Sequence, residues 1–135
     1  LLENYAKTIK IEGLCLAEMI AKDLLPSASA AASDLAATIA NKKMAGLDVE
    51  GTYELETVKK ITTLSSALCQ KVAGLEKALS EAAAVEGGEE LANYYHENVF
   101  TAMLDIRAAA DELETMISEK YLTYPTYGQL LFGVN

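Results

Sequence analysis

The chain has 135 residues, enough for one domain with a sizeable core, and a formal net charge of −9 that makes nucleic acid and anionic lipid poor partners. It is 51% hydrophobic but only 7% aromatic, contains two prolines, and is rich in strong helix formers. No apolar run approaches the roughly 20 residues that cross a bilayer, and the first residues lack the basic segment and apolar block typical of a signal peptide. We therefore expect a cytoplasmic, all-α protein that binds neither membrane nor nucleic acid.

The first predicted helical segment covers about residues 3–45. Apolar residues recur at helical spacing up to Leu24 and again from Ala28 to Ile39. Pro26 separates the two runs. Because proline lacks a backbone donor and clashes with the preceding turn, we expect the helix to kink or break there. The first run comprises Tyr5, Ile9, Leu16, Ile20 and Leu24, widened by Leu14, Cys15 and Met19.

Two further segments follow, at about residues 52–85 and 89–120. Thr52 is a plausible N-cap for the second segment, which Gly87 and Gly88 would end. Its predicted core stripe is Ile61, Leu64, Leu68, Val72, Leu75, Leu79 and Ala82. The stripe of the third segment is Leu91, Tyr95, Val99, Ala102, Ile106, Ala109, Leu113 and Ile117.

Three amphipathic segments with short glycine-containing connections predict an antiparallel bundle over residues 1–120. At about 1.5 Å per residue, the second and third segments span roughly 50 Å each and the first roughly 65 Å if unbroken. The excess length leaves two alternatives: a break at Pro26 that gives four helices, or an N-terminal part that projects beyond the bundle. Since the chain starts at Leu1 within a helical pattern, we expect it to be a piece of a longer chain.

The sequence contains no strong motif for catalysis or for metal binding. The one histidine, His96, follows Asn93 where a Glu-x-x-His metal motif needs a glutamate, so we expect a hydrogen-bonded surface or interface residue. Cys15 and Cys69 are expected to be buried free thiols, and the methionines at 19, 44, 103 and 116 to fill the core. We predict no catalytic, cofactor-binding or metal-binding residue in the chain.

Residues 121–135 form an aromatic, apolar tail. Aromatic groups supply large contact areas, so the tail is predicted to dock, either on its own bundle or on another domain. The candidate docking residues are Tyr121, Tyr124, Tyr127, Leu130, Leu131 and Phe132. Deleting residues 121–135 is expected to weaken stability or assembly.

Two stretches resemble a known family. LENYAKTIKIEGLCLAEMIAKDLLP, residues 2–26, is similar to the start of the C-terminal helical region of type III glutamine synthetases, and AAADELETMISEKYLTYPTYGQLLF, residues 108–132, to its end. The middle, including TYELETVKKITTLSSALCQKVAGLEKAL, is similar in layout, so the resemblance covers essentially the whole chain.

The resemblance implies a parent enzyme that joins ammonia to glutamate at the expense of ATP, with Mg or Mn. In that family the active-site residues lie on a β-rich catalytic domain upstream, and none of those motifs occurs in this chain. The family also forms large rings of subunits. The implied role is therefore a non-catalytic, structural or inter-subunit domain of a large homo-oligomer, with the catalytic domain and neighbouring subunits as partners. The alternative is a stand-alone helical adaptor that binds a protein partner.

Overall fold

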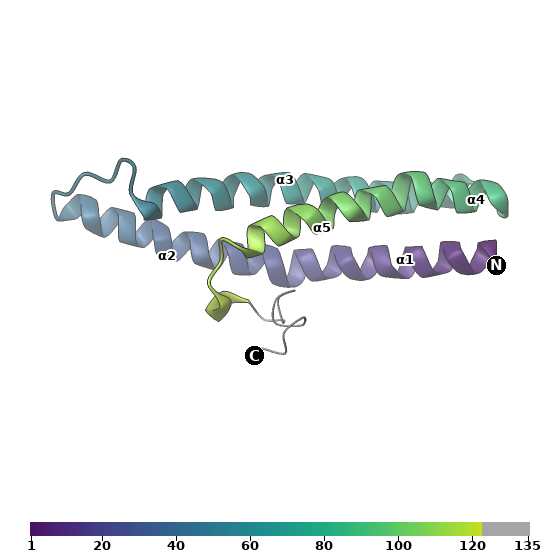
Figure 1. The fold of residues 1–135 in the computed structure, drawn as a ribbon, viewed down its shortest axis with the longest axis horizontal. Helices are drawn as coiled ribbons and strands as arrows, with labels where there is room; N and C mark the ends of the chain where they lie inside the picture. The colour runs from purple at the N-terminus through teal and green to yellow at the C-terminus, as the bar shows by residue number, and fades with distance from the viewer. Residues whose placement is uncertain (123–135) are drawn as a thin grey trace.

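In the computed structural model, residues 1–122 are described, and they form helices and their connections without a β-strand among them (Figure 1). The first long segment consists of α1 (Leu2–Met19), a π-helical turn η1 (Ile20–Leu24) and α2 (Leu25–Met44). The second consists of α3 (Tyr53–Glu81) and a 3-10 turn η2 (Ala82–Ala84). The third consists of α4 (Glu89–Tyr94), a π-helical turn η3 (Tyr95–Phe100) and α5 (Thr101–Glu114), after which a 3-10 turn η4 (Glu119–Tyr121) follows.

The predicted all-α fold with three long helical segments is confirmed. Each segment reverses the direction of the one before, as Figure 1 shows. The reversals use glycines in the left-handed region, with φ of 82° at Gly46, 74° at Gly51 and 80° at Gly88, a conformation that side chains with a Cβ rarely adopt. The second helix ends earlier than predicted, since α3 stops at Glu81 and η2 leads into the Gly87–Gly88 turn.

Pro26 does not divide the first segment into separate helices. The backbone N–H of Leu25 donates to the carbonyl of Ile20, five residues back, so a wide π-helical turn precedes the proline. Pro26 then lies in the first turn of α2, where its missing N–H does little harm. The alternative of four separate helices is therefore wrong: the backbone stays helical across residues 2–44, and α1 and α2 run end to end in Figure 1.

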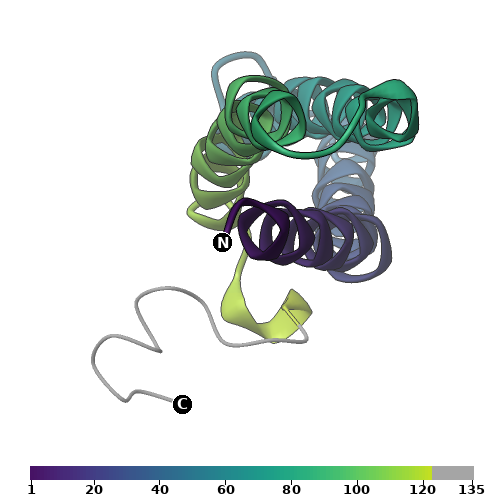
Figure 2. The same ribbon diagram turned by 90° about the vertical axis from the view of Figure 1, so that its right-hand side faces the viewer.

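The core lies where the three segments face each other. The helix α3 packs against α2 along its first half and against α5, while α1 packs against α4, η3 and α3. The view along the bundle in Figure 2 shows these helices around a common interior. Each large apolar side chain withdrawn from water there contributes about 1.5–3 kcal/mol. The largest fully buried side chains are Ile20, Leu24, Ile61, Leu68, Leu75, Val99, Met103, Ile106 and Leu113.

The two ends of the first segment differ. Ala6 and Ile9 are buried where α1 packs on α4, so the expectation that the N-terminal part projects is wrong. The other end projects instead, because α5 ends at Glu114 while α2 and the start of α3 continue past it (Figure 1). We call residues 35–60 the arm. The arm buries Ile39 and Val49 between its own two helices and their connection.

Four side chains that the sequence predicts to be buried are exposed: Leu14, Cys15, Met44 and Cys69. Cys15 and Cys69 are free thiols, as expected, but both lie on the surface. Cys69 directly follows Leu68, and a step of about 100° around the helix turns it away from the core that Leu68 enters. Met44 is 85% exposed at the end of the arm, whereas Met103 is fully buried.

No helix in the part of the chain that the structure describes is long and apolar enough to cross a membrane.

Candidate functional site

His96 joins the first and third segments. Its Nδ1 lies 3.2 Å from the hydroxyl of Tyr5 on α1, and its ring stacks on Phe100 with centroids 5.8 Å apart. The side chain is exposed. The prediction of a hydrogen-bonded surface residue is confirmed, and the contact fastens α1 to η3.

Other polar side chains also link helices to each other. Lys71 on α3 pairs with Asp105 on α5 at 2.7 Å. The hydroxyl of Tyr94 on α4 donates to the carbonyl of Ala78 on α3 at 2.5 Å, and burial raises the pKa of that hydroxyl. These contacts fix the alignment of neighbouring helices. Among residues 1–122, no group of three or more His, Cys, Asp or Glu side chains is placed to hold a metal ion.

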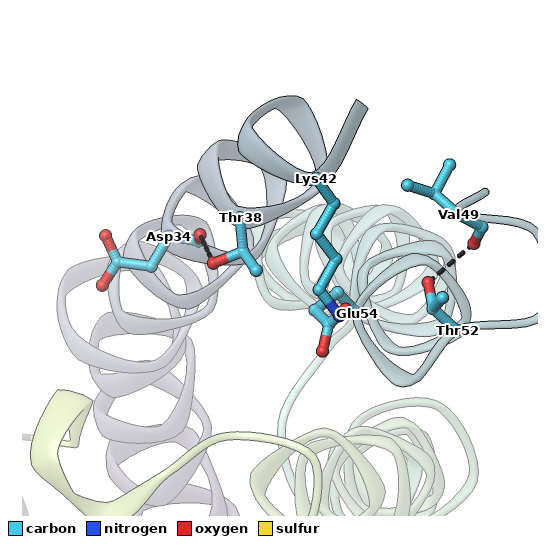
Figure 3. Close-up of polar contacts among 6 residues, drawn as sticks. All are labelled: Asp34, Thr38, Lys42, Val49, Thr52 and Glu54. Carbon is cyan, nitrogen blue, oxygen red and sulfur yellow. Dashed lines mark hydrogen bonds and ion pairs between the residues drawn. The ribbon is translucent and has the colours of Figure 1, made fainter. Parts of the chain in front are cut away.

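The arm has its own polar contacts, which Figure 3 shows. Lys42 of α2 forms an ion pair with Glu54 in the first turn of α3. Thr52 occupies the N-cap position of α3, as predicted, with extended backbone angles of −72° and 157°. Its hydroxyl, however, donates to the carbonyl of Val49 at 2.6 Å and caps no helix N–H. The ion pair joins α2 to α3, and the Thr52 bond lies within the connection between the two helices.

Tyr121 is the one predicted docking residue that the structure describes. It lies half-buried in η4 with its hydroxyl donating to Asp34 Oδ2 on α2, and the Lys120 ammonium lies 4.9 Å from its ring centroid. The bond to Asp34 raises the pKa of Tyr121. Tyr124, Tyr127, Leu130, Leu131 and Phe132 lie outside the described residues, so their docking stays a prediction. The division of the chain at residue 121 likewise stays a prediction.

A groove of about 360 Å³ opens beside this contact. Its walls come from α2, from the first residue of α3 and from the chain that follows α5. The lining residues are Ala31, Asp34, Leu35, Thr38, Tyr53, Met116, Ser118, Lys120 and Tyr121. Sequence reasoning missed Asp34 and Tyr53, because neither belongs to an apolar stripe and the groove joins residues far apart in the chain. The available signal was an aromatic residue, Tyr53, directly after the predicted N-cap of a helix.

Packed helices, polar contacts between those helices and a projecting arm define the class of this protein as an all-α helical domain.

Residues 1–43 match the family model of the glutamine synthetase C-terminal domain. Over 135 residues the chain is 39% identical to the glutamine synthetase of Butyrivibrio fibrisolvens, an alignment that covers 99% of this chain and 19% of that protein. No solved structure matches the chain.

The resemblance to glutamine synthetases is thereby confirmed: the chain is related to their C-terminal domain. It spans about a fifth of the length of the curated relative that it matches.

Proposed function

We propose that the chain is the non-catalytic C-terminal helical region of a type III glutamine synthetase and has a structural or inter-subunit role there. The parent enzyme would join ammonia to glutamate with ATP and Mg or Mn, in the cytoplasm, as a large homo-oligomer. The observation that carries the proposal is the 39% identity to a glutamine synthetase over nearly the whole chain. The catalytic domain of the same chain and neighbouring subunits are the proposed partners.

The use of the polar side chains supports a structural role. Lys71, Tyr94 and Lys42 each bond to a neighbouring helix, so their donors serve the packing of the bundle. In a structural domain we expect such hydrogen bonds and ion pairs between helices, because the alignment of the helices fixes the shape of the surface that a partner contacts.

The runner-up is a stand-alone helical adaptor, which the apolar end of the arm favours. Met44 is 85% exposed, Leu47 58% and Tyr53 70%. Exposed apolar groups that lie close together commonly mark a protein contact. An adaptor would bind its partner without any link to a ligase.

The test of the structural role breaks the bundle inside the intact protein. Leu68→Asp places a charge at a fully buried position of α3, whereas Leu47→Asp changes a 58% exposed residue of the arm and serves as control. We expect Leu68→Asp to lower the native mass of the assembly and its thermal stability, with Leu47→Asp close to wild type in stability. Unchanged assembly after loss of the bundle's helical signal would contradict the structural role.

A further inference from the structure

The groove beside η4 begins where the third segment ends. Leu35 of α2 continues the stripe of Leu24 and Ala28, and Tyr53 lies about two turns before the buried Ile61 of α3. In the body of the bundle, α5 packs on α3 and covers the face of α3 that corresponds to the groove wall. Past Met116 only the short turn η4 packs on α2 among the described residues, so Leu35 is only half-buried and Tyr53 is 70% exposed.

The described chain ends at this groove. Tyr121 lines it and donates its hydroxyl to Asp34, so residues 123–135 start within reach of the arm. The distance along α2 from Leu35 to Met44 is about 14 Å at 1.5 Å per residue. A segment of the length of 123–135 reaches about 40 Å when extended and about 20 Å as a helix, enough to follow the arm in either form.

The composition of residues 123–135 fits the apolar part of the groove, which Ala31, Leu35 and Met116 line beside polar side chains. In a chain of net charge −9, this stretch contains no Asp, Glu, Lys, Arg or His. Its large side chains are Tyr124, Tyr127, Leu130, Leu131 and Phe132. Burying them costs no desolvation of charge, and each large apolar side chain that leaves water is favourable.

We propose that residues 123–135 pack in cis along the arm, between α2 and the first turns of α3, as the third element that the arm lacks. The contact of Tyr121 with Asp34 is the start of this interface, and the groove of about 360 Å³ is its first part. The inference concerns how this chain packs and does not depend on the reaction of the parent enzyme.

Cross-linking in the intact protein tests the proposal. Cys15 and Cys69, both exposed, are first replaced by serine. Leu131→Cys is then combined with Thr38→Cys, which lines the groove, or with Ala36→Cys, which lies on the exposed opposite side of the same helix. With a short bis-maleimide, we expect the Thr38 pair to link about tenfold faster than the Ala36 pair, because docking raises the local thiol concentration.

Equal linking rates for the two pairs would overturn the proposal. Mixing isotope-labelled with unlabelled protein before cross-linking distinguishes links within one chain from links between two chains. Links within one chain support the proposal, and links between labelled and unlabelled chains overturn it. Tyr53→Ser, which alters a 70% exposed residue, should slow the Thr38 pair while the fold melts as before. Glutamine formation by the same preparations reports separately on the proposed ligase, so the two proposals fail independently.

Discussion

At the scale of single residues, the hydroxyl of Tyr94 makes the clearest polar contact between two helices. It donates to the Ala78 carbonyl from a half-buried position, and its removal leaves that carbonyl without this partner. We expect Tyr94→Phe to lower the free energy of unfolding by about 1 kcal/mol. Tyr5→Phe removes an exposed hydroxyl bonded to His96 and is the matched control, with a smaller loss. Equal melting temperatures for the two variants would contradict this ranking.

The tyrosines also predict a dependence on pH. Burial raises the pKa of Tyr94 and of Tyr95 above the ordinary value of 10.0. The unfolded chain therefore loses these protons first, and the folded state binds more protons at high pH. The free energy of unfolding should fall as the pH rises above about 10, with no change from these groups below it. Urea unfolding on both sides of that pH measures the loss, which should be smaller in the Tyr94→Phe, Tyr95→Phe double variant.

At the scale of the helices, position around the helix decides how much an apolar residue stabilises. Leu24 is fully buried in the π-helical turn before Pro26, while Leu14 in the same segment is 49% exposed. We expect Leu24→Ala to cost about 2–5 kcal/mol and Leu14→Ala less than about 0.5 kcal/mol. Denaturant unfolding of both variants checks the difference. Similar losses would mean that η1 is not part of the core.

Two glycines give opposite predictions. A Cβ on Gly13, within α1, would lie 3.5 Å from Met103 Sδ and 3.6 Å from Leu79 Cδ1, which is ordinary contact. Gly13→Ala should therefore raise the free energy of unfolding by about 0.5–1 kcal/mol through helix propensity. Gly88 has φ of 80°, so Gly88→Ala should lower it by about 1 kcal/mol. Thermal unfolding that moved in the same direction for both would contradict this account.

Helix periodicity in the sequence was sufficient to predict the segments and most of the core. Ile61, Leu68, Val72 and Leu75 repeat every three to seven residues and are all buried, because one face of α3 meets the rest of the bundle. The π-helical turns could not be predicted, since they depend on which carbonyl a backbone N–H reaches. The exposure of Cys69 could have been predicted from its position directly after Leu68.

At the scale of the whole molecule, the features that the sequence did not predict depend on contacts between residues far apart in the chain. The segment lengths predicted that one end of the first segment projects beyond the bundle, but not which end. Which end projects depends on where α5 stops along α3. The same holds for the docking site: the bond between Tyr121 and Asp34 joins residues 87 positions apart, and no local pattern predicts it. The arm and the groove follow from these alignments.

The central claim is that this chain is a non-catalytic region of a glutamine-forming ligase. The most direct test measures ATP-dependent glutamine formation from glutamate and ammonia, by the intact parent protein and by residues 1–135 alone. We predict glutamine from the intact protein and none from residues 1–135. Glutamine made by residues 1–135, or none made by the intact protein, would contradict the claim.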